Sequence, residues 1–304
     1  MDKCREFDCV IIGGGPGGLT SALYLRRFRR NVLLVQNGKP RAAWIPKTHN
    51  LIGYDQGISG SNLLARLRRQ VNACGMEWAR AEAKVHLLRK GFEIDLGARY
   101  GKVRAPKVIL ATGMRDVDPE IGNLLELRHL GLLRYCSICD GYEYRDQPIV
   151  VLAKDDFGLQ KALFLSQWTR KIRILHPAGM RVAPQRRHAL KMIPEIRLIE
   201  CETFEMEAQR SPLGLRVRPL GHRPFYARAA YVELGCHLLD SSYGHLKSLT
   251  RTREGFIPAT SEQRTSIPGL FAVGDCVNLL GQIAVAAGQA AVAATTVHNE
   301  LMSW

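Results

Sequence analysis

Two of the eight cysteines, Cys136 and Cys139, form a Cys-x-x-Cys motif that continues as Asp140-Gly141. This spacing brings two sulfurs close enough to bridge, and it tends to lower the pKa of one thiol toward neutrality, which supplies the thiolate that exchange needs. Asp140 can act as the acid and base that moves the accompanying protons. No second Cys-x-x-Cys and no His pair stands at ligand spacing, which disfavours zinc. The motif therefore predicts a redox centre and no metal site.

A glycine turn, Gly13-x-Gly15-x-x-Gly18, lies between an apolar strand expected at residues 8–12 and a helix expected at about 17–29. Gly13 permits the tight turn, Gly15 lets the backbone approach a pyrophosphate, and Gly18 lets helix and strand pack closely. The helix N-terminus adds partial positive charge. With a second strand at residues 31–35, this is a dinucleotide-binding βαβ unit. The residues of the turn expected to contact the dinucleotide are Gly13, Gly15, Pro16 and Gly18.

Gln36 ends the second strand, where an acidic residue usually bonds a ribose hydroxyl. An amide can still form that hydrogen bond, without charge assistance. Two further strands support FAD as the dinucleotide. One ends in Ala-Thr-Gly, with Thr112 and Gly113, and the other ends in Gly274-Asp275, whose carboxylate can bond ribityl hydroxyls.

A second βαβ unit follows, with strands expected at residues 149–152 and 172–175 and a helix near 158–168. Two such units imply two dinucleotide-type folds. In the second, Ala153 and Asp155 replace the first two glycines, and Asp155 and Asp156 are expected to place carboxylates where a diphosphate would lie. Like charges ~4 Å apart repel by about 4 kcal/mol at an effective dielectric near 20. The second unit is therefore not expected to bind a dinucleotide.

The order of these motifs resembles that of the low-molecular-weight thioredoxin reductases over nearly the whole chain. The resemblance implies that Asn50 lies near the flavin and that the backbone of Gln282 and Ile283 touches its pyrimidine ring. It also implies that Cys139 faces the flavin, while Cys136 attacks the disulfide of thioredoxin. Where that family carries His-Arg-Arg to hold the 2′-phosphate of NADPH, this chain has His-Pro-Ala at residues 176–178.

The expected architecture is α/β, with two Rossmann-like dinucleotide-binding domains of the three-layer FAD/NAD(P)-binding kind, the second inserted in the first. An Ala/Gly-rich helix near the C-terminus is expected to return to the first domain and to pack on something flat. Residues 1–117 and 248–304 would form the FAD-binding domain. Residues 118–247 would form a degenerate pyridine-nucleotide-like domain that carries the Cys pair. The family precedent suggests a homodimer.

The 304 residues carry a net charge of +15. The sequence shows no signal peptide and no membrane span, which favours a cytoplasmic protein, and no nucleic-acid-binding motif accompanies the charge. Basic clusters occur at residues 26–30 and 66–69. Because the NADPH site is expected to be lost, the excess positive charge favours an acidic electron donor such as ferredoxin.

Three functions are compatible with these patterns. In the first, electrons pass from ferredoxin to FAD, to the Cys pair and to thioredoxin. The second is an FAD-dependent dithiol oxidase that uses oxygen. Such oxidases share the Gly-Tyr-Glu at residues 141–143, but they typically carry His where this chain has Asp140. The third is a flavin-bound redox sensor or interaction protein with little turnover. The C-terminal Trp304 could cover the flavin, stack on a partner chain or belong to a frayed end. We expect the first function, because of Asp140 and the charge.

Overall fold

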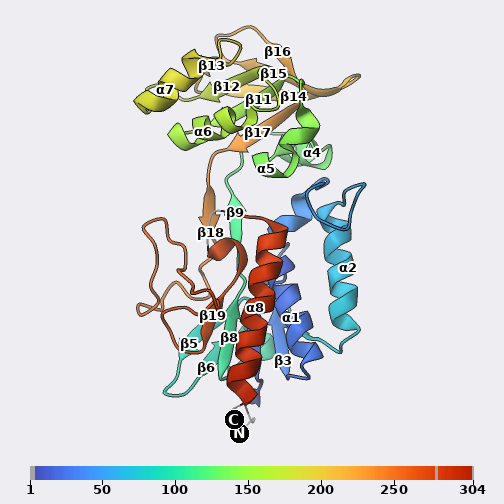
Figure 1. The fold of residues 1–304 in the computed structure, drawn as a ribbon, viewed down its shortest axis with the longest axis vertical. Helices are drawn as coiled ribbons and strands as arrows, with labels where there is room; N and C mark the ends of the chain where they lie inside the picture. The colour runs from blue at the N-terminus through green and yellow to red at the C-terminus, as the bar shows by residue number, and fades with distance from the viewer. Residues whose placement is uncertain (1–3, 278–279, 303–304) are drawn as a thin grey trace. The chain divides into compact units, whose positions relative to one another are not determined.

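The computed structural model describes residues 4–277 and 280–302, so Trp304 lies outside the described residues. The chain forms two compact units, each described by itself (Figure 1). The first unit comprises the chain up to Trp44, Ser59–Arg115 and the chain from Leu238 onward, and the second comprises Ile45–Ile58 and Asp116–His237. The domain boundaries expected from the sequence, 117/118 and 247/248, stay predictions.

The first unit is built on a five-stranded parallel sheet in the order β19-β8-β2-β3-β4. Its central strands are short apolar runs, and every residue of β2, β3 and β19 is buried. Parallel strands covered on both faces need such continuous apolar sequences. The strands of this sheet are β2 (Cys9–Ile12), β3 (Val32–Val35), β4 (Glu77–Ala79), β8 (Lys107–Leu110) and β19 (Leu270–Ala272).

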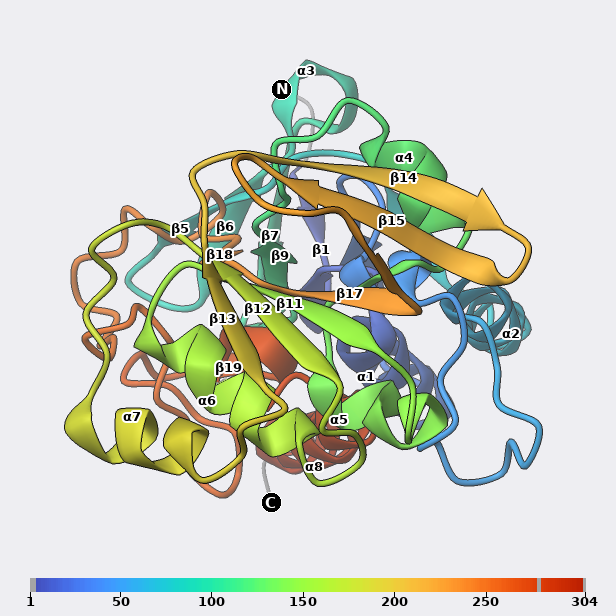
Figure 2. The ribbon, with the colours of Figure 1, turned by 90° about the horizontal axis from the view of Figure 1, so that it is seen from above.

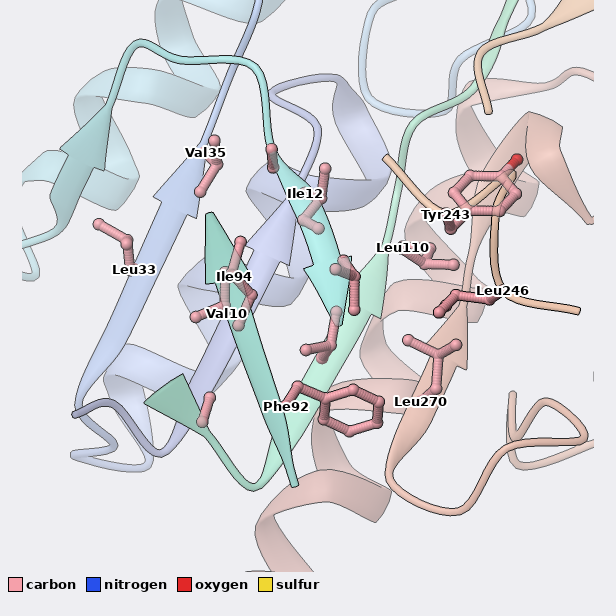
Figure 3. Close-up of a cluster of buried hydrophobic side chains, with 14 of the residues drawn as sticks. Val10, Ile12, Leu33, Val35, Phe92, Ile94, Leu110, Tyr243, Leu246 and Leu270 are labelled. Atoms are coloured by element: carbon pink, nitrogen blue, oxygen red, sulfur yellow. The ribbon is translucent and has the colours of Figure 1, made fainter. Parts of the chain in front are cut away.

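A second sheet in the order β1-β7-β6-β5 covers one face of the parallel sheet. Val10 and Ile12 of β2 share one apolar cluster with Phe92 and Ile94 of the second sheet, and Tyr243 closes the cluster (Figure 3). The strands of the second sheet are β1 (Arg5–Glu6), β5 (Lys84–Leu87), β6 (Phe92–Asp95) and β7 (Lys102–Ala105), and α3 (Gly97–Tyr100) precedes β7.

Helix α1 (Pro16–Arg27) packs along α8 (Ile283–Met302) (Figure 1). The buried face of α8 is rich in alanine, which lets the two helices approach closely. At the far end, the Phe28 ring stacks on His298, 4.4 Å between ring centroids. The Ala-rich helix belongs to the first unit, where it packs on another helix. Helix α2 (Gly60–Asn72) also packs on α1, and the short helix η1 (Arg41–Trp44) packs on α2.

The second unit is a three-layer arrangement around a parallel sheet in the order β10-β17-β11-β12-β13. Helices α6 and α7 lie on one side of this sheet, and strands β14 and β15 lie on the other (Figure 2). Side chains of β11 alternate between these layers: Ile149 and Val151 join the cluster with α6, whereas Val150 and Leu152 join the cluster with β14 and β15.

The bounds of these elements are β10 (Leu133–Arg134), β11 (Ile149–Ala153), α6 (Asp156–Leu165), β12 (Ile172–His176), α7 (Pro184–Lys191), β13 (Arg197–Glu200), β14 (Phe204–Arg210), β15 (Leu213–Pro219), β16 (Phe225–Ala227) and β17 (Ala229–Glu233). Strand β16 extends the β14-β15 hairpin, α4 (Leu124–His129) precedes β10, and β9 (Met114–Asp116) pairs with β18 (Cys236–Leu238) where the chain passes between the units. The predicted α/β class with two Rossmann-like sheets is confirmed. Within residues 4–277 and 280–302, no helix is long and apolar enough to cross a membrane.

Replacing Phe92 with Ala tests the core of the first unit. Phe92 is 1% exposed and lies directly opposite Leu87, which is 44% exposed, in the β5-β6 ladder. We expect Phe92→Ala to lower the free energy of unfolding by about 3–5 kcal/mol. The matched control Leu87→Ala should change it by about 0.5 kcal/mol or less. Urea denaturation followed by circular dichroism measures both, and equal effects of the two variants would contradict the packing described above.

Candidate cofactor cradle and redox disulfide

The first glycine turn is held closed by contacts of the chain with itself. Gly13 has φ of +120°, and a Cβ there would lie 2.1 Å from the carbonyl oxygen of Ala111. A Cβ on Gly18 would lie 1.8 Å from the carbonyl oxygen of Gly13. Neither position can carry a side chain without moving backbone, so these two glycines bring the start of α1 against the end of β2.

Gly15 has a different reason to be glycine. Its φ of −83° is ordinary, and a Cβ there would meet only the side chain of Pro40, at 3.8 Å. Gly15 is the N-cap of α1, no side chain caps this helix end, and Pro16 follows in the first turn. The protein therefore leaves room beside a helix N-terminus, which is the site that a pyrophosphate prefers. These residues fit the predicted dinucleotide.

The amide of Gln36, at the end of β3, is fixed on both sides. Its Nε2 donates to the carbonyl oxygen of Gly38 at 2.8 Å, and its Oε1 accepts from Nη2 of Arg68 at 3.3 Å. A Cβ on Gly14 would lie 2.0 Å from the same Oε1. Arg68 and Gly14 thus hold the side chain that was predicted to bind ribose. The sequence did not reveal this role of Arg68, because α2 is distant along the chain.

Asp275 follows β19 in the short helix η3 (Gly274–Cys276) and pairs with Arg41, 3.1 Å between Oδ2 and Nη1. A Cβ on Gly281 would lie 2.7 Å from Nη1 of Arg41. The amide of Gly274 donates to Oε1 of Gln289 at 2.7 Å. Helix α8, the loop after β19 and η1 therefore meet around the predicted ribityl-binding carboxylate.

Parallel pairing places the carboxyl ends of β2, β8 and β19 at one edge of the sheet. Ligands bind at this edge in open α/β folds. The predicted cofactor residues that lie in the first unit are Gly13, Gly15, Pro16, Gly18, Gln36, Thr112, Gly113, Gly274, Asp275, Gln282 and Ile283. Asn50 lies in the second unit, where its Oδ1 accepts from Oγ1 of Thr48 at 2.7 Å.

Cys136 and Cys139 form a disulfide, with 5.4 Å between their Cα atoms, so the predicted bridge is confirmed. Cys136 follows β10 and caps the short helix α5 (Ser137–Asp140), which runs into η2 (Gly141–Tyr144). A Cβ on Gly141 would lie 2.4 Å from the ring of Trp168. The glycine after Asp140 is therefore needed to seat the disulfide segment against the end of α6.

Asp140 is buried at the end of the disulfide segment, and both of its carboxylate oxygens have partners. Its Oδ1 accepts from the hydroxyl of Tyr231 at 2.9 Å, and its Oδ2 lies 3.0 Å from Nη1 of Arg134. Burial raises the pKa of Asp140, and the charge of Arg134 is the largest opposing influence. The predicted acid/base residue is thus an ion-paired carboxylate. Neither Arg134 nor Tyr231 was foreseen from the sequence.

In the second βαβ unit, the carboxylate of Asp155 caps the N-terminus of the helix. Asp155 is the N-cap of α6, and its Oδ1 accepts from the amides of Phe157 at 3.0 Å and Gly158 at 3.2 Å. Asp156 differs from the sequence expectation. It pairs with Arg186 and accepts from the amide of Ala183, so Arg186 neutralises its charge. Asp155 alone therefore occupies the helix end.

The end of β12 also meets a carboxylate. The amide of Ala178 donates to Oε1 of Glu202 at 2.9 Å. Ala178 is one of the two positions at which this chain lacks the arginine that the thioredoxin reductases carry. Glu202 follows β13 and was not recognised, because its partner lies 24 residues away along the chain.

Gly15→Ala tests the cradle. Inside the chain, the new methyl group meets only Pro40, so we expect the loss of a helix-cap preference, about 1 kcal/mol, and no loss of fold. The methyl group does enter the space beside the helix end, so the affinity for FAD should fall at least about tenfold, or 1.4 kcal/mol. The control is Gly122→Ala, where a Cβ meets nothing within 4 Å. Flavin per chain after dialysis measures occupancy, and full occupancy in Gly15→Ala would contradict the placement.

Comparisons with known proteins agree with this geometry. Residues 7–194 match the family model for pyridine nucleotide-disulphide oxidoreductases. The thioredoxin reductase of Aquifex aeolicus is 26% identical, over 98% of this chain and 94% of its own length. The structure of Streptococcus pyogenes thioredoxin reductase, 24% identical, covers 99% of this chain and 100% of its own with a TM-score of 0.90, which shows the fold.

The atypical thioredoxin reductase TRi of Desulfovibrio vulgaris Hildenborough is 29% identical, with a TM-score of 0.53 over 99% of this chain and 100% of its own. The two-sheet fold, the glycine cradle and the Cys136–Cys139 disulfide agree with these matches. The chain therefore belongs to the pyridine nucleotide-disulphide oxidoreductase family, as a thioredoxin reductase-like, FAD-dependent disulfide oxidoreductase.

Proposed function

We propose that this protein reduces the disulfide of a thioredoxin through Cys136 and Cys139, and that its electrons come from ferredoxin or a similar acidic donor and not from NADPH. The relatives named thioredoxin reductases support the acceptor. The carboxylate of Asp155 on the first amides of α6 is the observation that carries the proposal about the donor.

Asp155 acts against a nucleotide in two ways. First, its carboxylate already accepts hydrogen bonds from the amides of Phe157 and Gly158, which a pyrophosphate would otherwise use. Displacing it removes a helix cap, which costs about 1 kcal/mol. Second, a displaced carboxylate remains near a dianionic ligand and repels it. The corresponding position of the first unit, Gly15, has no side chain.

The carboxylate of Glu202 disfavours binding of the adenosine end of NADPH. In dinucleotide folds, the loop after the second strand of the βαβ unit holds the adenosine ribose, and an arginine accommodates a 2′-phosphate. In this chain the corresponding loop bonds the carboxylate of Glu202 through the amide of Ala178. A negative charge at this position disfavours a 2′-phosphate.

The distribution of charge supports an acidic donor that docks on the first unit. The first unit contains 24 Lys or Arg residues and 12 Asp or Glu residues, whereas the second unit contains 19 and 16. Arg66 and Arg69 of α2 are exposed. A local excess of positive charge accelerates association with an acidic protein.

FAD, when bound, supplies a carrier that can accept single electrons and deliver a pair. The chain contributes the disulfide, which opens to one thiolate and one thiol with two electrons and one proton. Through the exchange roles implied by the family resemblance, Cys136 attacks the thioredoxin disulfide and Cys139 then releases the reduced thioredoxin.

Asp140 argues against the dithiol oxidase. An oxidase of that kind needs a base that can take a proton from a small dithiol. Asp140 is paired with Arg134 and hydrogen-bonded to Tyr231. Both of its carboxylate oxygens therefore already have partners in the protein, which makes it a poor base for a substrate thiol. The Gly-Tyr-Glu that those oxidases share begins with Gly141, which has a packing reason of its own against Trp168.

Flavin reduction under anaerobic conditions tests the donor. We expect negligible reduction by NADPH or NADH at millimolar concentration and stoichiometric reduction by reduced ferredoxin. The rate with ferredoxin should fall steeply between 0.01 M and 0.15 M salt, because the Debye length shortens from ~30 Å to ~8 Å. Rapid bleaching by either nucleotide would contradict the proposal. Turnover with a small dithiol and oxygen, without reduction by ferredoxin, would favour the oxidase, and reduction without transfer to thioredoxin would favour a sensor.

The docking face is tested by reversing charge at two positions. Arg66→Glu with Arg69→Glu should slow reduction by ferredoxin at low salt. Arg68 must stay, because it holds Gln36 in the cofactor cradle. The control is Arg210→Glu with Arg223→Glu, an equal change of charge at two exposed positions of the second unit. Equal slowing by both pairs would show that net charge, and not this face of α2, governs the rate.

The roles of the two cysteines are tested with a thioredoxin that carries one active-site cysteine activated with thionitrobenzoate. The Cys139→Ser variant keeps Cys136 as the attacking thiolate, so it should release thionitrobenzoate and form a mixed disulfide. The Cys136→Ser variant should react at least about tenfold more slowly, since its remaining thiol is expected to face the flavin. Absorbance at 412 nm follows the release, and the reverse order of rates would exchange the two roles.

A further inference from the structure

A buried polar network lies under the disulfide segment. Arg134 from β10 and Asp140 from the end of α5 form an ion pair whose side chains are 14% and 9% exposed. The hydroxyl of Tyr231 from β17 donates to the second carboxylate oxygen. Arg134 also donates from Nη2 to the hydroxyl of Tyr144 at 2.6 Å and from Nε at 3.0 Å, and lies over its ring. Each oxygen of Asp140 therefore has a partner.

This arrangement decides how tightly Asp140 holds a proton. Burial raises the pKa of Asp140, and the nearby charge of Glu143 raises it further. Arg134 lowers it most, followed by the hydroxyl of Tyr231, and His49 contributes in the same direction. Burial raises the pKa of Tyr231 well above its usual value, so Tyr231 stays a hydrogen-bond donor. Arg134 is thus the group that most strongly opposes the rise in the pKa of the buried carboxylate.

Asp140 shares the short helix α5 with Cys139, so its ionisation bears on the charge around the disulfide segment. Asp140 directly follows Cys139 in the chain, and Cys139 becomes a thiol or thiolate each time the bond opens. A thiolate formed beside an unpaired carboxylate meets a like charge, which favours proton uptake by one of the two groups. A thiolate formed beside a neutral Arg134–Asp140 pair does not meet that repulsion.

We propose that Arg134 is a positioning residue of the redox centre, which acts through Asp140 to set the proton uptake that accompanies opening of the Cys136–Cys139 bond. In the complete reaction with a dithiol reductant, the dithiol loses two electrons and two protons and closes to its own disulfide. The protein disulfide gains the two electrons and one proton, which gives one thiol and one thiolate, and the second proton goes to the solvent. Below the pKa of that thiolate, the protein takes up both protons. The inference rests on the redox role of the disulfide and not on the identity of the electron donor.

The test measures the equilibrium between the flavin-loaded protein and dithiothreitol from pH 5 to pH 9. Anaerobic samples are quenched with an alkylating agent, and mass spectrometry gives the fraction of open disulfide at each pH. Asp140→Asn identifies the inflection that belongs to Asp140, because that inflection disappears. We expect Arg134→Gln to move it upward by at least one pH unit, since the largest pKa-lowering influence is lost. Arg134→Lys, which keeps the charge, should hold it within about half a unit.

Two further variants keep the test decisive if Arg134→Gln folds poorly. Tyr231→Phe removes the second pKa-lowering contact and should shift the inflection upward by less than Arg134→Gln. The double variant Arg134→Gln/Asp140→Asn leaves no unpaired charge and should match Asp140→Asn alone. A profile of Arg134→Gln that overlays the unmodified protein would overturn the proposal. So would a shift that persists in the double variant, because Asp140 would then not carry the effect. Failure of these outcomes leaves the donor measurements unaffected.

Discussion

Nucleotide binding in each unit depends on the first turn of the helix that follows a parallel strand. The backbone amides of this turn can donate hydrogen bonds either to a ligand or to a side chain of the protein itself. In the first unit, the N-cap of α1 is Gly15, which brings no side chain and leaves room beside the amides. In the second unit, the N-cap of α6 is Asp155, whose carboxylate takes two of those amides. The same supersecondary structure is thus open in one copy and self-capped in the other, and we propose that this difference removes NADPH as a donor.

The redox centre lies in the same unit as the closed turn. Cys136, Cys139 and Asp140 stand in a short segment that Gly141 seats against Trp168 and that Arg134 and Tyr231 tie to the sheet. Such a network is costly to break at one member, since the remaining buried charge is left unpaired. The second unit therefore has a function that does not require a nucleotide: it holds a disulfide and the charged pair beneath it.

Features that depend on neighbouring residues were predictable from the sequence. The two βαβ units, the turn at Gly13 and Gly18 and the Cys136–Cys139 bridge all follow from local spacing. Features that depend on distant residues were not. Arg134 and Tyr231 converge on Asp140 from two strands that pair only in the folded sheet. The packing of α8 on α1 and the pairing of Asp156 with Arg186 were missed for the same reason, because periodicity shows which face is apolar and not which partner covers it.

We propose that this chain has one working dinucleotide site. Calorimetric titration of the FAD-loaded protein with NADP⁺, and with 2′,5′-ADP as a probe of the phosphate contacts alone, measures this most directly, since binding is read without any electron transfer. We expect one FAD per chain and no saturable heat with either ligand up to millimolar concentration. We also expect Asp155→Gly with Glu202→Gln to strengthen 2′,5′-ADP binding. Saturable binding of NADP⁺ at one site per chain with a micromolar Kd in the unmodified protein would contradict the proposal.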